Sequence, residues 1–185
     1  LFLDKKWRNF FLNEPRGGVF KHCNIIVEPS NKNADAGFVI MEPEDNPPMS
    51  GSNAICVTTV LLEKNIIQMQ YPKTSLTLEA PGGLIKVIAD CENKKVKNVT
   101  LTNLACFADK IDVDLKTKNF GTIKVSTAFG GDSFLICNAS NFNLKIEPKN
   151  AIKFVNIAKE LLNEANTSIG FEHPTITGLN YLSFC

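Results

Sequence analysis

The sequence has few histidines and no closely spaced cysteines, which leaves little material for a metal centre. Its two histidines, His22 and His173, are separated by most of the chain, and its six cysteines are dispersed. Zinc sites and redox motifs need close Cys or His pairs. We therefore expect no metal site and no serine–histidine–aspartate triad, and we interpret both histidines as structural hydrogen-bonding residues.

Charge of one sign is not in excess either. Lys and Arg total 20 against 19 Asp and Glu, a net charge of +1. Such a balance gives no electrostatic footprint for nucleic acid or for an anionic membrane. No signal peptide or membrane span is visible, and the dispersed cysteines favour free, buried thiols over disulfides. These features predict a cytoplasmic protein without nucleic-acid or membrane partners.

Apolar residues are plentiful, at 44% of 185 residues, which is enough for a substantial core in one large or two small domains. Period-two alternation and short apolar runs predict strands. The predicted strands cover residues 23–27, 37–41, 75–78, 84–88, 96–101, 111–115, 123–126 and 134–137. Apolar residues at helical spacing, among them Ile152, Val155 and Leu161, predict a helix over 150–165 that packs on a sheet.

The most informative segment is a polar turn that leads into an apolar helix, over residues 47–63. Apolar residues occur on nearly every side of this helix, so we expect sheets to enclose it. The first amides of a helix lack internal partners and lie at the positive end of its dipole. Here they belong to Gly51, Ser52 and Asn53, and a carboxylate is their natural ligand. Ser50 either acts on the carbon beside that carboxylate or caps the helix.

Four stretches resemble, in the same order, motifs of the proline racemase family. They are Asn13-Glu14-Pro15-Arg16-Gly17, Met49-Ser50-Gly51-Ser52-Asn53, Ala80-Pro81-Gly82-Gly83-Leu84-Ile85 and Ala128-Phe129-Gly130-Gly131-Asp132-Ser133-Phe134. The second of them looks like the first catalytic motif of the family, which reads Met-Cys-Gly-His in most members. Four ordered matches across most of the chain make the resemblance specific.

The resemblance implies an α/β (α+β) fold of the diaminopimelate-epimerase type, in which two similar lobes each wrap β-sheet around a central helix and enclose a substrate cleft between them. We expect the first lobe at 1–102 and an incomplete second lobe at 103–185. The family's chemistry needs no cofactor and uses two residues on opposite faces of the ring carbon that bears the carboxylate. By resemblance Ser50 takes the first catalytic position, and Gly51, Ser52 and Asn53 bind the substrate.

The sequence also departs from the family pattern. Ser50 stands in place of cysteine, as in one branch of the family, and Ser52 replaces histidine. A serine hydroxyl is a far weaker acid than a thiol, so it relays or donates a proton more easily than it deprotonates a carbon acid. The family's second catalytic segment has no counterpart, and Cys185 is not assigned that role. We expect a piece of a longer protein or a natural truncation, which begins inside an amphipathic helix at 1–8.

Three functions are left open by these residues. The first is epimerisation of 4-hydroxyproline at its α-carbon. The second is dehydration of trans-3-hydroxy-L-proline, which needs one base and a departing hydroxyl and is compatible with serine at position 50. The third is a truncated, non-catalytic family member. The two enzymatic hypotheses imply a small-molecule substrate, and a homodimer is also considered.

Overall fold

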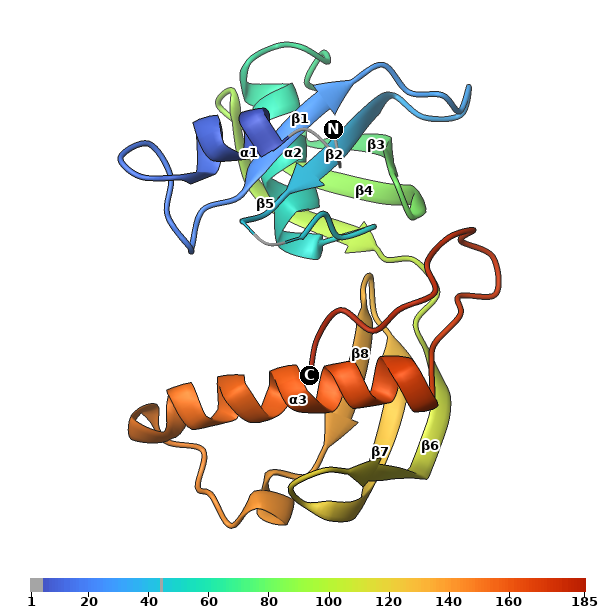
Figure 1. The fold of residues 1–185 in the computed structure, drawn as a ribbon. Helices are drawn as coiled ribbons and strands as arrows, with labels where there is room; N and C mark the ends of the chain where they lie inside the picture. The colour runs from blue at the N-terminus through green and yellow to red at the C-terminus, as the bar shows by residue number, and fades with distance from the viewer. Residues whose placement is uncertain (1–4, 44) are drawn as a thin grey trace. The chain divides into compact units, whose positions relative to one another are not determined.

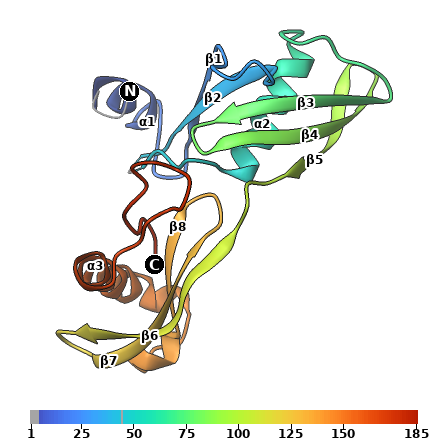
Figure 2. The ribbon, with the colours of Figure 1, turned by 90° about the vertical axis from the view of Figure 1, so that its right-hand side faces the viewer.

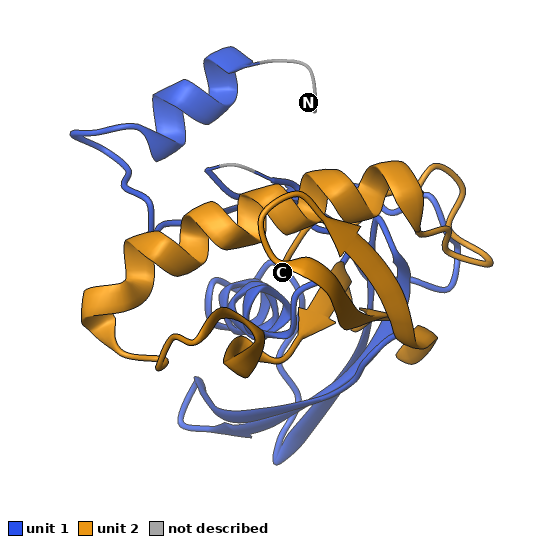
Figure 3. Ribbon diagram, turned by 60° about the horizontal axis from the view of Figure 1, so that its bottom comes forward, with its two compact units in different colours: residues 1–104 blue, residues 105–185 orange. Residues whose placement is uncertain are grey.

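Figure 1 shows the fold in a computed structural model that describes residues 5–43 and 45–185. The chain divides into two compact units, residues 1–104 and residues 105–185, which Figure 3 shows in blue and orange. The predicted N-terminal helix is present as α1 (Lys5–Leu12). Residues 1–4 of that prediction lie outside the described residues.

Unit 1 is built on a five-stranded sheet of order β1-β2-β3-β4-β5. Its strands are β1 (Cys23–Val27), β2 (Ala36–Met41), β3 (Lys73–Ala80), β4 (Gly83–Glu92) and β5 (Lys95–Thr102). Neighbouring strands are antiparallel except β2 and β3, which run parallel. The strand predictions for this unit are confirmed, and β3 and β4 form the expected hairpin around Pro81 and Gly82.

Helix α2 (Gly51–Glu63) lies against this sheet (Figure 2). It contacts both edge strands, β1 and β5, and also β4. Because both edges reach the same helix, the sheet must curve around it, as twisted sheets do. The core between them is made of fully buried side chains, which include Phe38, Ile40, Leu61, Leu78 and Ile85. Each contributes roughly 1.5–3 kcal/mol by its burial, and together they hold α2 in place.

One face of α2 stays uncovered by unit 1, so the prediction that sheets enclose the whole helix is wrong for this unit. Ile55 is 40% exposed and Val60 is 44% exposed, and Cys56 and Ser52 are exposed as well. From Ser52 these positions follow at i+3, i+4 and i+8, which places them on one side of the helix. An apolar composition predicted the helix but could not show which of its faces the sheet covers.

Unit 2 contains a three-stranded antiparallel sheet of order β6-β7-β8 and one long helix. Its elements are β6 (Phe107–Thr117), β7 (Gly121–Phe129), β8 (Ser133–Cys137), the 3-10 helices η1 (Ala139–Phe142) and η2 (Pro148–Asn150), and α3 (Ala151–Ser168). Helix α3 packs on β6 (Figure 1). The C-terminal segment returns to β8, where Phe184 pairs with Phe134 and their ring centroids lie 5.6 Å apart. The strand predictions for this unit are confirmed.

The helix predicted over 150–165 is confirmed as α3, but its packing is only partly as expected. Leu161 and Ala165 are buried, whereas Ile152 is 79% exposed and Val155 is 51% exposed. Helical spacing therefore predicted the helix correctly, but it wrongly predicted that the first two turns are buried. Within the described part of the chain, no helix combines the length and the apolar character needed to cross a membrane.

Truncating the centre of α2 tests this packing. Leu61 has no exposed surface, so Leu61→Ala should lower the free energy of unfolding by about 2–5 kcal/mol through the cavity it leaves. Val60→Ala, on the uncovered face of the same helix, should cost less than about 1 kcal/mol. Urea denaturation followed by circular dichroism measures both changes. Equal losses from the two substitutions would contradict the placement of α2.

Candidate functional site

The segment that leads into α2 is supported by the β3–β4 hairpin. The Gly82 amide donates a 2.9 Å hydrogen bond to the Pro48 carbonyl. A Cβ atom at position 82 would lie 3.2 Å from that carbonyl oxygen and 2.6 Å from Leu104 Cδ1, so this close approach requires glycine. The next residue after Pro48, Met49, is 3% exposed and packs in the core. The glycine-containing hairpin therefore fixes the backbone immediately before Ser50.

The same segment is tied to the end of β2 and to α1 through Asn46. This side chain is buried, and its Nδ2 donates to the Ile40 carbonyl at 2.7 Å. Its Oδ1 accepts a hydrogen bond from the Arg8 guanidinium of α1. Buried amides are stable only when they are paired in this way. The loop before α2 is thus held from several sides, although loops are usually mobile.

Ser50 occupies the N-cap position of α2 but does not cap the helix with its side chain. Its backbone is extended, with φ −141° and ψ 127°, and its carbonyl accepts the first helical hydrogen bond from the Ala54 amide at 3.0 Å. The hydroxyl makes no capping hydrogen bond. The interpretation of Ser50 as a side-chain cap is therefore wrong, and the hydroxyl is available for another role.

The predicted site residues share the first turn of α2. Gly51, Ser52 and Asn53 follow Ser50 directly, and their amides belong to the helix end that lacks intrahelical acceptors. Ser52 is exposed, whereas Ser50 and Gly51 are half-buried. The Ser50 and Ser52 hydroxyl oxygens lie 3.3 Å apart. Two hydroxyl groups and an electropositive helix end are therefore brought together.

The Asn53 side chain turns away from solvent, at 4% exposure, and forms a hydrogen-bond network behind Ser50. Its Nδ2 donates to Ser50 Oγ at 2.9 Å and lies 3.3 Å from His22 Nδ1. Its Oδ1 accepts from Asn24 Nδ2 at 2.9 Å. The His22 ring, in turn, has its Nδ1 3.2 Å from Glu42 Oε1. Ser50 is thus joined through Asn53 to a chain of polar groups.

Sequence reasoning missed His22, Asn24 and Glu42 as members of this site. His22 was interpreted as a structural residue, and nothing in its neighbours suggested a link to position 53. One signal was available, because His22 directly precedes β1 and Asn24 lies two residues further on, a spacing that places side chains on the same side of an extended chain. What the sequence could not show is that β1 lies beside the first turn of α2.

Metal ligands do not gather in the described residues, since no group of three or more His, Cys, Asp or Glu side chains is close enough to hold an ion. None of the six cysteines forms a disulfide. Cys91 is buried, but Cys56, Cys106 and Cys185 are exposed. The prediction of buried thiols is therefore wrong for these three.

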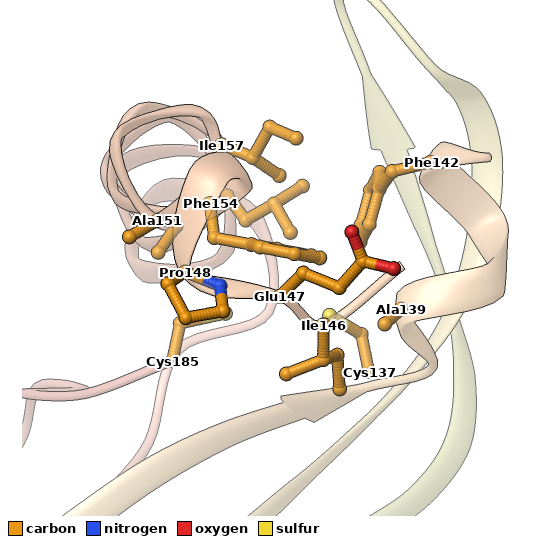
Figure 4. A pocket seen from close by; sticks show the side chains of 12 residues that line it. Cys137, Ala139, Phe142, Ile146, Glu147, Pro148, Ala151, Phe154, Ile157 and Cys185 are labelled. Atoms are coloured by element: carbon orange, nitrogen blue, oxygen red, sulfur yellow. The ribbon is translucent and has the colours of Figure 1, made fainter. Parts of the chain in front are cut away.

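Unit 2 contains an apolar cavity of about 620 Å³ between α3, η1 and the C-terminal end of β8 (Figure 4). Phe142 and Phe154 line it together with two cysteines, Cys137 and Cys185. A hydrogen bond from the Cys185 thiol stabilises the Cys137 thiolate and lowers the pKa of Cys137 to about 7. The same contact raises the pKa of Cys185. None of the predicted site residues lies in this cavity.

The cysteine pair predicts a pH dependence. The thiolate fraction of Cys137 should rise as the pH passes about 7, so alkylation of Cys137 by iodoacetamide should accelerate around that pH. Cys185→Ala removes the thiol donor, and the midpoint should move up toward the ordinary value of about 8.5. Peptide mass spectrometry measures the rate at each pH, and Cys106→Ala is the control. A midpoint that does not move in Cys185→Ala would refute the contact.

Comparison with known proteins gives this geometry a context. A family model described as Proline racemase matches residues 2–185. A hydroxyproline epimerase from Agrobacterium vitis, solved with bound trans-4-OH-L-proline, is 35% identical with a TM-score of 0.84, over 96% of this chain and 52% of that chain. A probable proline racemase from Agrobacterium radiobacter K84, solved with bound carbonate, is 33% identical with a TM-score of 0.84, over 95% of this chain and 52% of that chain.

A more distant structure shares the fold. Methylitaconate-delta-isomerase is 15% identical with a TM-score of 0.53, over 80% of this chain and 48% of that chain. The α+β fold of the diaminopimelate-epimerase type, predicted from the sequence, is confirmed by these likenesses. The chain spans about half the length of the solved relatives that it matches.

Proposed function

The chain belongs to the proline racemase family, and from that premise we propose that the protein containing it is a cofactor-independent isomerase that inverts the α-carbon of 4-hydroxyproline. The observation that carries the proposal is the Ser50 hydroxyl, which stands at the start of α2 beside the first-turn amides and is not used as a cap. The similar epimerase with bound trans-4-OH-L-proline supports the substrate class. The proposal keeps two expectations from the sequence, a cytoplasmic location and a homodimer.

In this mechanism the substrate carboxylate binds to the amides of Gly51 and Ser52, with Asn53 completing the turn. Helix N-termini suit anions because their amides are unpaired and the helix dipole is positive there. Removal of the α-proton places further negative charge on the carboxylate. Donors already aimed at this group stabilise the transition state more than the ground state, an effect typically worth about 10²–10³ in rate per donor.

Ser50 is the acid–base group on one face of the α-carbon. An alcohol is a weak acid, so its anion needs stabilisation, and the 2.9 Å hydrogen bond from Asn53 Nδ2 supplies it. With its oxygen accepting this bond, the hydroxyl proton remains available for transfer to a carbanion. The group on the opposite face is not assigned to any of residues 1–185.

Dehydration of trans-3-hydroxy-L-proline is the second candidate. It requires removal of the α-proton and loss of the neighbouring hydroxyl, so it needs no proton return from the opposite face. The single acid–base group at position 50, a serine where most family members have cysteine, favours this alternative. Both reactions use the same carboxylate site, and they differ in the step after proton removal.

Proton exchange distinguishes these functions. The full-length protein should incorporate deuterium at the α-carbon of trans-4-hydroxy-L-proline in deuterated water, with formation of the cis-4-hydroxy-D epimer, followed by NMR. Ser50→Ala should lower the rate at least about 10²-fold, the usual contribution of a general acid or base. Ser75→Ala, at an exposed serine of β3, is the matched control.

Three outcomes of this experiment would change the proposal. Loss of the hydroxyl from trans-3-hydroxy-L-proline, without epimerisation of the 4-hydroxy substrate, would identify the dehydratase. No exchange with either substrate, from a folded protein, would favour a non-catalytic family member. Full activity in Ser50→Ala would remove Ser50 from the mechanism.

A further inference from the structure

We propose that His22 is a positioning residue that holds the Asn53 amide with its nitrogen, rather than its oxygen, toward Ser50. This inference rests on the proposed function, because it explains how a serine at position 50 is prepared for proton transfer. It is carried by four contacts, which link Ser50, Asn53, Asn24, His22 and Glu42.

A buried amide can be placed in two orientations that differ only in which end is the donor. In one, Asn53 Nδ2 donates to Ser50 Oγ at 2.9 Å, and the serine keeps its proton available. In the other, Asn53 Oδ1 would face Ser50, accept its hydroxyl proton and hold it. Only the first orientation stabilises negative charge on the serine oxygen. The orientation of Asn53 therefore decides whether Ser50 can take part in proton transfer.

Asn24 alone does not select between these orientations. Its Nδ2 donates to Asn53 Oδ1 at 2.9 Å, but a joint turn of both amides would form the same bond with donor and acceptor exchanged. Within the described residues, the buried Oδ1 of Asn24 has no hydrogen-bond partner that would resist this turn. The selection must come from another group that contacts the Asn53 nitrogen.

His22 is that group. Its Nδ1 lies 3.3 Å from Asn53 Nδ2, so an unprotonated Nδ1 accepts from Asn53 and requires the nitrogen on that side. A protonated Nδ1 would require the Asn53 oxygen there. Because the same end of the amide faces Ser50, the oxygen would then face Ser50 as well, which is the unproductive orientation. The form of His22 with its proton on Nε2 therefore prepares Ser50 through Asn53.

Glu42 acts on the same nitrogen in the opposite sense. Its Oε1 lies 3.2 Å from His22 Nδ1, and because a carboxylate oxygen only accepts hydrogen bonds, it can pair with that nitrogen only when the nitrogen carries the proton. Both side chains are partly sheltered, with 38% of His22 and 18% of Glu42 exposed. Asn53 and Glu42 thus compete for His22 Nδ1. Removing His22 and removing the charge of Glu42 should consequently have opposite effects on Ser50.

The kinetic test uses the opposite effects expected from removing His22 and from removing the charge of Glu42. In the full-length protein, His22→Leu should lower kcat for α-proton exchange roughly ten- to a hundredfold, the effect of a misplaced catalytic group, with KM nearly unchanged. Glu42→Gln should raise kcat, because the competitor for Nδ1 is gone. Glu92→Gln, which removes a carboxylate that pairs with Lys97 at 3.6 Å, is the matched control. A merely structural ion pair would make His22→Leu and Glu42→Gln equally harmful, and that result would overturn the proposal.

A spectroscopic test is independent of activity. The chain has only two histidines, so long-range 1H–15N spectra of histidine-labelled chain can show which nitrogen of His22 carries the proton. We expect Nε2, and a proton on Nδ1 would overturn the proposal. If the wild-type protein exchanges the α-proton and the His22→Leu variant does so at the same rate, the role of His22 is refuted but the proposed function stays intact. Absence of exchange in the wild-type protein would instead refute the proposed function, and the catalytic role of His22 with it.

Discussion

Asn53 is buried to all but 4% of its surface, and a buried amide is costly unless its donors and acceptor are paired. Its pairing links three parts of unit 1. Ser50 precedes α2, Asn24 belongs to β1, and His22 lies just before β1. The first turn of α2 must therefore stay beside β1, and the curved sheet keeps it there through the core around Leu61 and Phe38. Stability and the candidate chemistry depend on the same placement.

The presence of serine rather than cysteine at position 50 gives this network its significance. A thiolate is formed readily near neutral pH, whereas an alkoxide is not. A serine therefore depends on its surroundings for any acid–base role, and here the buried amide behind it supplies a hydrogen bond. In the proposed mechanism the first-turn amides of Gly51 and Ser52 bind the substrate rather than the serine. Both sets of donors come from one short segment, which the Gly82 contact with Pro48 supports.

The sequence predicted the local elements well, because their signals are local. Alternation predicted β7, and the polar turn followed by apolar residues predicted α2 and placed Ser50 at its start. Which face of each helix is covered by the rest of the protein was harder to predict. Ile55 and Val60 in α2, and Ile152 and Val155 in α3, are apolar at helical spacing and yet exposed. Spacing reports which residues share a face, but it carries no information on what lies opposite that face.

The candidate site was predictable to the same extent. Ser50, Gly51, Ser52 and Asn53 are consecutive, so a motif was enough to find them. His22 and Glu42 reach the site only because β1 lies beside α2 and because Glu42 directly follows β2. These are contacts between segments distant in sequence, and no spacing rule encodes them. The missed residues are those proposed to act through Asn53, while the residues proposed to touch the substrate are the ones that the motif suggested.

The central claim is that the carboxylate of a proline derivative binds at the first turn of α2 with its α-carbon against Ser50. A crystal structure of the full-length protein with trans-4-hydroxy-L-proline tests it most directly. The expected complex has carboxylate oxygens within about 3 Å of the Gly51 and Ser52 amide nitrogens and the α-carbon about 3–3.5 Å from Ser50 Oγ. A carboxylate bound away from this turn, with Ser50 remote from the α-carbon, would contradict the claim.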